Sequence, residues 1–228
     1  MTTLAVLPVK AFAGAKSRLS ERLQPPERRA LAEAMFSDVL TALRRTTTLD
    51  GVIVVTGDFT AQRIAGSHGV DVVEDRQEQG QSPAAAVGLS RAHKRGAERV
   101  LLVPGDCPAL DHAELEALLA RELPARGAII VADRHGTGTN GLLIQPPDAL
   151  PPAFGEGSFG RHKQLAAEAD LPLENVVAPS LALDVDSPAD LDALREHLAA
   201  QRGGAAHTRG LLLRFDRSAP TRSAPTPA

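Results

Sequence analysis

The chain has 228 residues, with 25 Lys and Arg against 28 Asp and Glu and a formal net charge of -3. It contains six Phe and no Trp or Tyr, so it offers neither the basic surplus nor the aromatic rings that nucleic-acid binding commonly uses. The length suits one large or two small globular domains. We therefore expect a small-molecule or protein partner rather than a nucleic acid.

The compartment follows from cysteine usage and hydropathy. Cys107 is the single cysteine, which excludes an intramolecular disulfide. No apolar run approaches the length that spans a bilayer, and the first stretch, MTTLAVLPVK, lacks the basic segment and long apolar core of a secretory signal. We expect a cytoplasmic protein with a reduced thiol and no membrane partner.

Short apolar runs alternate with amphipathic stretches in the first half of the chain. The patterns predict strands at 4–9, 51–56, 70–74 and 99–104, and helices at 25–46, near 59–67 and at about 83–95. In the helix at 25–46, apolar residues recur every four positions, which places them on one face. This alternation is typical of strand–helix units around a mostly parallel sheet.

The second half departs from this alternation. Strands at 127–133 and 141–146 are separated by RHGTGTN, which is more typical of a hairpin or an active-site loop than of a crossover helix. A helix at about 158–169, a strand near 174–178, the run LALDVD at 181–186 and a helix at about 187–200 follow. Ser187 is the expected N-cap of that last helix, with Pro188 at its first position and Asp190 at its third.

The composition changes again after residue 200, to Gly, Ala, Ser, Thr, Pro and Arg. We predict residues 201–228 to form a mostly disordered tail, in which only the apolar run LLLRF at 211–215 could dock on the domain. Residues 1–200 are predicted to form the folded α/β part of the chain, around a mostly parallel sheet.

Three aspartates are candidate metal ligands. Asp106 follows the buried strand RVLLVP, and ligands of open α/β sheets bind beyond the carboxyl ends of the strands; its alternative role is to cap a turn or the helix near Asp111. Asp184 and Asp186 would point to one face if LALDVD is a strand. Together the three carboxylates could hold one or two Mg²⁺ ions, although Asp186 could instead cap the helix that Ser187 begins.

Two segments are candidate nucleotide-binding loops. VKAFAGAKSRL carries Lys10, Lys16 and Arg18, which are either a solvated basic surface or a set of cations facing a triphosphate. Gly80 and Ser82, in GQSPAAAVGL, precede a helix of small residues that would let a base or ribose approach the backbone, although such a helix can also be close-packed core.

A third segment, FGEGSFGRHK, is a candidate anion site. Gly155 and Ser158 lie just before a helix whose free N–H groups could bind an anion, and the basic residues of its first turn would oppose the helix dipole unless an anion is bound. We do not expect Cys107 to be catalytic, because the neighbouring charge of Asp106 disfavours its thiolate. The histidines show no zinc-ligand spacing and are expected to be structural or exposed.

These motifs stand in the order LPVK…AKSRL, GQSPAAAVGL, LLVPGDCPAL, ADRHGTGTNGLL, FGEGSFGRHK and LDVDSPADL. From about residue 4 to 198, the chain resembles the guanylyltransferase family of coenzyme F-420 biosynthesis, which includes 2-phospho-L-lactate guanylyltransferases and bacterial relatives that use phosphoenolpyruvate. DRxGTGTN and FGxxS in tandem are specific to that family, whereas PGD is shared with many nucleotidyltransferases. The resemblance implies that residues 1–200 form a single nucleotidyltransferase-type α/β domain, GT-A-like and Rossmann-like, with a mixed, mostly parallel central sheet flanked by helices.

The resemblance also implies an activity, in which GMP passes from GTP to phosphoenolpyruvate and gives enolpyruvoyl-2-diphospho-5'-guanosine and pyrophosphate. Thr139, Gly155 and Ser158 match the family's phosphoenolpyruvate-binding positions. The aspartates at 106, 184 and 186 match its acidic metal cluster, for which we expect Mg²⁺. We further expect Asp106, Lys16 and Arg18 to act in catalysis, and a downstream F-420-assembly transferase to take the unstable product.

Three alternatives remain open at this point. The acceptor could be 2-phospho-L-lactate, although the Arg- and Ala-rich composition resembles that of high-GC bacteria, where the family is associated with phosphoenolpyruvate. Another GT-A-type nucleotidyltransferase or a glycosyltransferase would share the fold and the acidic residues. A non-catalytic nucleotide-binding regulator would share the nucleotide site but release no pyrophosphate.

Overall fold

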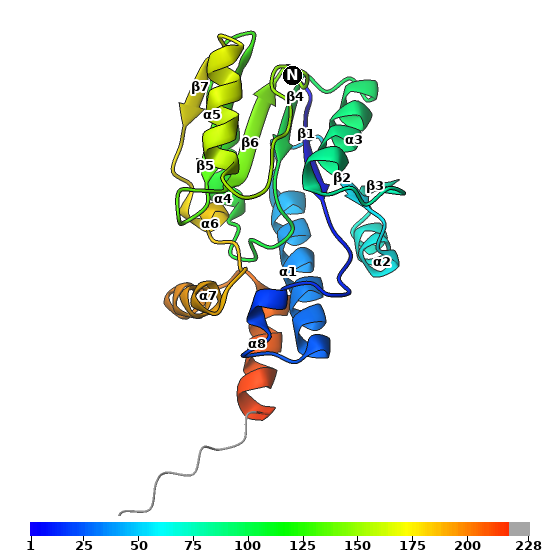
Figure 1. Ribbon diagram of the computed structural model, residues 1–228, viewed down its shortest axis with the longest axis vertical. Helices are drawn as coiled ribbons and strands as arrows, with labels where there is room; N and C mark the ends of the chain where they lie inside the picture. The colour runs from blue at the N-terminus through cyan, green and yellow to red at the C-terminus, as the bar shows by residue number, and fades with distance from the viewer. Residues whose placement is uncertain (219–228) are drawn as a thin grey trace, which may run out of the picture.

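The computed structural model describes residues 1–218, which form a seven-stranded sheet with helices on both faces (Figure 1). The strands are β1 (Thr3–Pro8), β2 (Gly51–Thr56), β3 (Asp71–Glu74), β4 (Arg99–Leu102), β5 (Gly127–Ala132), β6 (Thr139–Gln145) and β7 (Leu173–Asn175). Their order across the sheet is β3-β2-β1-β4-β6-β5-β7. Among these strands β6 runs antiparallel to both neighbours, and the other pairs are parallel, which confirms the mixed, mostly parallel sheet.

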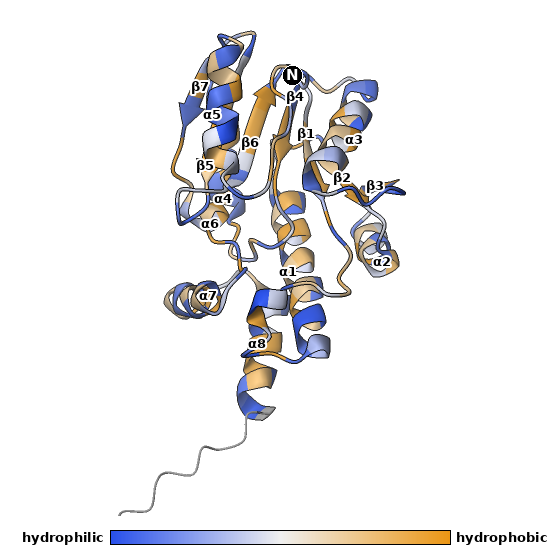
Figure 2. Cartoon of the chain, in the orientation of Figure 1, coloured by the Kyte–Doolittle hydropathy of each residue, from blue (hydrophilic) through white to orange (hydrophobic). Residues whose placement is uncertain are grey.

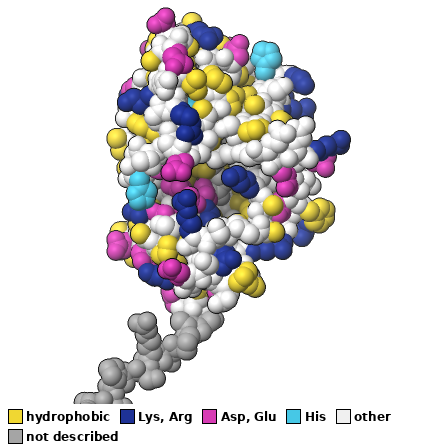
Figure 3. Space-filling model, in the orientation of Figure 1, with side chains coloured by type: hydrophobic (Ala, Val, Ile, Leu, Met, Phe, Trp, Pro, Cys, Tyr) yellow, Lys and Arg dark blue, Asp and Glu magenta, His cyan; other side chains and the backbone are white. Residues whose placement is uncertain are grey.

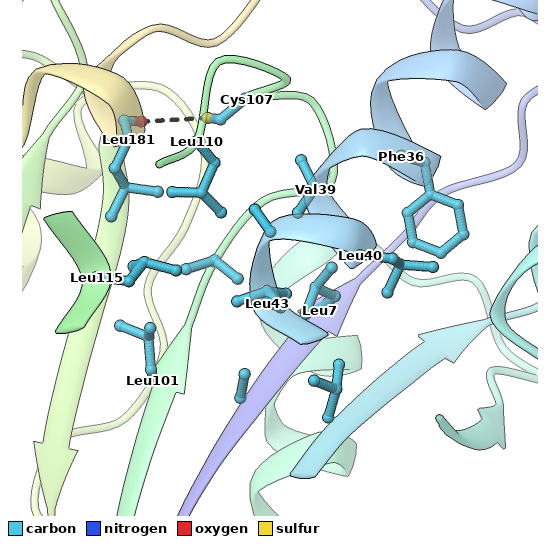
Figure 4. Packing of buried hydrophobic residues seen from close by; sticks show 14 of the residues in the cluster. Leu7, Phe36, Val39, Leu40, Leu43, Leu101, Cys107, Leu110, Leu115 and Leu181 are labelled. Carbon is cyan, nitrogen blue, oxygen red and sulfur yellow. Dashed lines mark hydrogen bonds between the residues drawn. The ribbon is translucent and has the colours of Figure 1, made fainter. Parts of the chain in front are cut away.

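Helices cover both faces of the sheet and explain why its central strands are apolar along their whole length. The helices are η1 (a 3-10 turn, Ser17–Leu19), α1 (Pro25–Arg45), α2 (Phe59–Ser67), α3 (Gln81–Lys94), α4 (His112–Leu119), α5 (Ser158–Glu168), α6 (Pro179–Ala182), α7 (Pro188–Ala200) and α8 (Ala206–Ser218). Side chains of α1, α2 and α4 share a core cluster with one face of the sheet (Figure 4), and those of α3 and α5 share one with the other. The hydropathy colours of Figure 2 follow this arrangement, with the sheet among the most apolar parts. Within residues 1–218, no helix combines the length and apolarity needed to cross a bilayer.

The predicted hairpin is confirmed by the antiparallel pairing of β5 and β6. Asp133 organises the loop between them: its Oδ1 accepts the N–H groups of His135 at 3.1 Å and Thr137 at 2.8 Å. The side chain of Arg134 then reaches away from the hairpin and donates to Asp190, on α7, at 2.6 Å. The glycine- and threonine-rich motif is therefore a fixed loop that is tied to another element.

The run LALDVD does not form the strand that its alternation suggests. Residues 179–182 make the short helix α6, and residues 183–187 lead irregularly into α7. The expected N-cap is confirmed: the Ser187 hydroxyl accepts the N–H of Asp190, whose carboxylate in turn accepts the N–H of Ser187. This reciprocal capping fixes the backbone immediately after Asp186.

The predicted disorder from residue 201 is wrong for the part that forms α8. The helix packs along α1 (Figure 1), and Leu211 and Leu212 are buried in a third core cluster. Asp38, itself buried in α1, accepts the first N–H groups of α8, from His207 at 3.0 Å and Thr208 at 2.8 Å. Residues 219–228 of the predicted tail lie outside the described residues.

Candidate functional site

A cavity of about 560 Å³ opens at the carboxyl ends of β1, β2, β3 and β4. Its walls come from the loop after β1, from Gly57 after β2, from the segment between β3 and α3, and from residues 104–106 after β4. Figure 3 shows acidic and basic side chains gathered around the hollow on this face of the molecule. Four parallel strands thus deliver four chain segments to one pocket, as the strand-end rule predicts.

Lys16 and Asp106 meet in this cavity. The Lys16 ammonium donates to Asp106 Oδ2 at 2.5 Å and to Asp186 Oδ1 at 2.9 Å, and its side chain is 8% exposed. Burial alone would lower the pKa of Lys16, but the charges of the two aspartates and their hydrogen bonds outweigh it and raise that pKa. The site therefore holds a fixed positive charge between two carboxylates.

The backbone of the loop after β1 places this ammonium. Lys16 has left-handed dihedrals, with φ 56° and ψ 39°, which are unfavourable for a residue with a Cβ and recur at functional sites. Asp58, the N-cap of α2, holds the same loop by accepting the N–H of Phe12 at 2.9 Å. The loop is thus anchored at its start by α2 and at its end by the acidic residues.

The capping roles considered for two aspartates are not observed. Asp111 caps α4 by accepting the N–H of Ala113 at 2.8 Å, which leaves the Asp106 side chain to Lys16. Ser187 and Asp190 cap α7, and the Asp186 carboxylate likewise binds Lys16. Both carboxylates face the cavity.

Asp184 is the third member of this group. Burial, followed by the charge of Asp106, raises the pKa of Asp184 to about 6, and a hydrogen bond from Asn140 Nδ2 at 2.9 Å partly opposes that shift. The three predicted aspartates are therefore close enough to repel one another. Asp184 and Asp186 nevertheless lie in an irregular segment rather than in the strand considered for LALDVD. Within residues 1–218, no group of three or more His, Cys, Asp or Glu side chains is arranged to hold a metal ion, and the cation between Asp106 and Asp186 is Lys16.

The predicted phosphoenolpyruvate-binding residues gather around a buried histidine. Thr139, at the start of β6, and Ser158, the first residue of α5, are both buried. His162 Nδ1 lies 3.0 Å from Thr139 Oγ1, and its Nε2 accepts the N–H of Ala153 at 2.9 Å. Because Nε2 is the acceptor, a neutral His162 donates from Nδ1 and leaves the Thr139 hydroxyl hydrogen for another acceptor.

Burial lowers the pKa of His162 to about 4, so the ring is neutral at pH 7 and structural, as expected for the histidines. Gly155 has φ 111°, which favours glycine, and its carbonyl accepts the N–H of Ser158 at 3.0 Å. Arg161, expected to face an anion, instead donates to the carbonyls of residues 153, 154 and 156 and closes that loop on itself. The anion-binding groups left at this end are N–H groups and hydroxyls.

The remaining predicted nucleotide-binding residues divide into two pairs. Lys10 and Gly80 line the cavity. Arg18 is exposed on η1, outside the cavity wall, and the Ser82 hydroxyl points to the carbonyl of Phe154 at 3.4 Å. Ser82 therefore connects the nucleotide loop to the loop that carries Gly155 rather than facing the cavity.

Cys107 is buried, and its thiol donates to the carbonyl of Leu181 at 3.2 Å (Figure 4). Burial, followed by the charge of Asp106, raises the pKa of Cys107. A thiol that remains protonated is a poor nucleophile, which agrees with the expectation that Cys107 is not catalytic.

Sequence reasoning missed three residues at this site: Asn140, Asp75 and Glu78. Asn140 is the last letter of GTGTN and joins the acceptor motif to Asp184. Asp75 and Glu78 follow β3 and line the cavity. The strand-end rule that selected Asp106 also applies to them, because β3 is parallel to the neighbouring strand β2.

The comparisons with known proteins identify the family of this chain. A phosphoenolpyruvate guanylyltransferase of Conexibacter woesei is 54% identical over 96% of this chain and 99% of its own length. A 2-phospho-L-lactate guanylyltransferase of Methanothermobacter thermautotrophicus is 33% identical over 94% of this chain and 92% of its own. The crystal structure of a putative nucleotide-diphospho-sugar transferase from Desulfovibrio desulfuricans shares the fold, with a TM-score of 0.75, 18% identity and coverage of 95% and 96%. The model of the family described as "Guanylyl transferase CofC like" matches residues 3–218, and the chain therefore belongs to that family.

Proposed function

We propose that this protein transfers the guanylyl group of GTP to phosphoenolpyruvate and releases pyrophosphate. One observation carries the proposal: the Lys16 ammonium, Asp106 and Asp186 face a nucleotide-sized cavity, and Asn140, the neighbour of Thr139, donates to the third carboxylate, Asp184. Such a site can hold the triphosphate at one end and receive a phosphorylated acid from the other. The names of two relatives support transfer of a guanylyl group, and one of these names supports phosphoenolpyruvate as the acceptor.

The chemistry is in-line attack of a phosphate oxygen of the acceptor on the α-phosphorus of GTP, with pyrophosphate as the leaving group. The new P–O bond forms as the bond to the β-phosphate oxygen breaks. A phosphate monoester has a second pKa of about 6 and is largely a dianion at pH 7, so the attacking oxygen carries no proton and requires no general base. This reaction is consistent with the states of His162 and Cys107, since both nitrogens of His162 are hydrogen-bonded and the Cys107 thiol stays protonated, so that neither residue is available as a base.

The barrier that the protein must lower is the repulsion between two anions. Lys16 stays charged because the aspartates raise its pKa, and Lys10 lies on the same cavity wall. The Thr139 hydroxyl and the N–H groups near Ser158 would orient the acceptor's oxygens. Binding and positioning by these groups replace acid–base catalysis.

We assign Mg²⁺ as the cofactor and Asp106, Asp184 and Asp186 as the residues that would hold it. The side chains of residues 1–218 are not arranged as a metal site, but the chemistry of the donors suits the ion, since all three supply the oxygen ligands that Mg²⁺ prefers. Burial and then the charge of Asp106 raise the pKa of Asp184, and the Lys16 ammonium lies between the other two carboxylates. When bound, the ion would neutralise charge on the triphosphate.

We propose phosphoenolpyruvate rather than 2-phospho-L-lactate as the acceptor, because the relative that is 54% identical to this chain is named a phosphoenolpyruvate guanylyltransferase. We place the reaction in the cytoplasm and in coenzyme F-420 biosynthesis, where a downstream transferase would consume the unstable product. The test is pyrophosphate release from GTP and Mg²⁺ with each acceptor, in the presence of such a transferase as a trap.

Release with phosphoenolpyruvate and little with 2-phospho-L-lactate is the expected result. Release with the lactate alone would reverse the acceptor assignment. Pyrophosphate release with a sugar phosphate but with neither of these acids would identify a different nucleotidyltransferase. If no acceptor leads to pyrophosphate release, only nucleotide binding remains as the function.

A further inference from the structure

The cavity has two ends with different sets of charges. At the first end Lys10 and Lys16 lie with Asp106 and Asp186, so that cations and carboxylates balance. At the second end Asp75 and Glu78 come from the segment between β3 and α3, and no Lys or Arg of that segment lines the cavity beside them. A triphosphate would be repelled by the carboxylates of the second end unless a cation intervened. If GTP binds here, its phosphates lie toward the lysines and its base toward the β3 segment.

Backbone geometry places Glu78, whose side chain is exposed, at this second end. Glu78 has φ 45°, in the left-handed region that a residue with a Cβ rarely adopts. Its N–H donates to Asp75 Oδ1 at 3.1 Å, as does that of Gln77 at 3.2 Å. Asp75 is therefore a positioning residue, whose side chain fixes the turn that carries Glu78.

Gly57 makes room for this carboxylate. A Cβ built at Gly57 would lie 2.4 Å from Glu78 Oε1 and 2.8 Å from the carbonyl oxygen of Asp75. The Glu78 side chain could turn away from such a Cβ, but the backbone carbonyl of Asp75 could not, so Gly57 lets the turn that carries Glu78 pack against the end of β2, where both residues line the cavity. In the part of the chain that the structure describes, the Glu78 carboxylate accepts no hydrogen bond and forms no ion pair.

A free carboxylate in a base pocket selects guanine. The Watson–Crick edge of guanine presents two adjacent donors, N1–H and the 2-amino group, which match the two oxygens of a carboxylate. Adenine presents an unprotonated N1 at the same place, and its lone pair would face a negative charge. We propose that Glu78 binds the guanine edge of GTP and sets the base specificity of the enzyme, an inference that rests on the proposed function.

Replacing Glu78 by Gln provides a test with a gain of activity. The amide offers one acceptor and one donor, which complement the N1–H and C2 carbonyl of xanthine. For Glu78→Gln we expect kcat/KM for GTP to fall by roughly 10- to 100-fold, the range for a lost charged hydrogen bond, mainly through KM. We expect kcat/KM for XTP to rise by at least about tenfold in the same variant, because a carboxylate oxygen no longer faces the C2 carbonyl oxygen of xanthine.

Glu74→Gln is the matched control, because Glu74 is exposed, pairs with Arg76 and lies outside the cavity wall. It should leave the GTP to XTP ratio unchanged. A structural role for Glu78 would reduce turnover with both nucleotides and lower the melting temperature, and that result would overturn the proposal. An unchanged GTP to XTP ratio in Glu78→Gln would also overturn it.

Failure of the proposed function is separable from failure of this inference. Calorimetric binding of GTP and XTP to the two proteins, with no acceptor present, measures base preference without turnover. If the native protein binds GTP but transfers nothing to phosphoenolpyruvate, the acceptor assignment fails. A change of binding preference from GTP to XTP in Glu78→Gln would then still support the role of Glu78 in base specificity, and an unchanged preference would overturn it.

Discussion

At the scale of single residues, the centre of the site is an ion triad of one lysine and two aspartates. Lys16 is 8% exposed and Asp106 is 28% exposed, while Asp186 is 52% exposed. A buried charge is stable only where it is paired, so each partner fixes the position of the others. The most buried carboxylate partner of Lys16 is Asp106, which makes it the most informative residue to change.

Asp106→Asn should lower kcat/KM for guanylyl transfer by at least about 100-fold, because the amide removes one negative charge from the group that positions Lys16 and would hold Mg²⁺. The fold should persist, since the amide can still accept a hydrogen bond from Lys16. Steady-state pyrophosphate release and thermal unfolding check the two halves of this prediction. Asp192→Asn, which alters an exposed pair with Arg22, is the control, and equal turnover in both variants would contradict the role of Asp106.

Asp184 gives the nucleotide-free protein a distinct pH dependence. Its pKa is about 6 in the folded protein against an ordinary value of 3.8, so the folded state binds the proton more tightly than the unfolded chain does. The stability from this site is full below about pH 4 and is lost as the pH rises through 6.

Asp184→Asn, which cannot ionise, should therefore match the native protein near pH 4 and exceed its free energy of unfolding by about 1–2 kcal/mol at pH 7.5. Urea unfolding at both pH values, without nucleotide or metal, measures the difference. A variant that is less stable than the native protein at pH 7.5 would show that the carboxylate is not repelled by its neighbours.

Residue identities at the site were easier to predict than side-chain directions. Asp106 and Lys10 follow from the rule that ligands bind at strand ends. Asp184 and Asp186 lie near Asp106, but they reach it from an irregular segment after α6 rather than from the strand that the alternation suggests. The directions of Arg18 and Ser82 depend on contacts with distant segments, which local pattern does not encode.

At the scale of elements, α8 shows how a distant residue can decide whether a segment folds. Its sequence is poor in apolar residues and starts after two glycines, which favours disorder. The helix forms because α1 extends past the sheet and presents both an apolar face and the carboxylate of Asp38. That carboxylate satisfies two N–H groups that a helix start leaves open.

Asp38→Ala should lower the free energy of unfolding by about 2–3 kcal/mol, because it removes a buried cap and leaves two N–H groups without an acceptor. Chemical denaturation measures that loss, and hydrogen exchange of the α8 amides should accelerate most. Asp216→Ala, also on α8, removes an exposed ion pair with Arg195 of α7 and should change stability by less than about 0.5 kcal/mol. Similar effects of the two substitutions would contradict the capping role.

At the scale of the whole molecule, the alternation of strands and helices predicted the class of fold but not the order of strands. Which strands become neighbours depends on contacts between residues far apart in the chain, such as the pairing of β1 with β4. The placement of β6 between β4 and β5 brings Thr139 and Asn140 next to the acidic group. The active site is therefore assembled by topology, and motif order alone does not specify it.

The most direct test of direct guanylyl transfer is the fate of the α-phosphorus. The protein would be incubated with GTP labelled with ³²P at that atom, Mg²⁺ and phosphoenolpyruvate, and the label followed in the small-molecule and protein fractions at short times, before the unstable product decays. Direct attack predicts label in a product that contains phosphoenolpyruvate, in equal amount to pyrophosphate, and none on the protein. Label bound covalently to the protein, or recovered only as GMP, would contradict it.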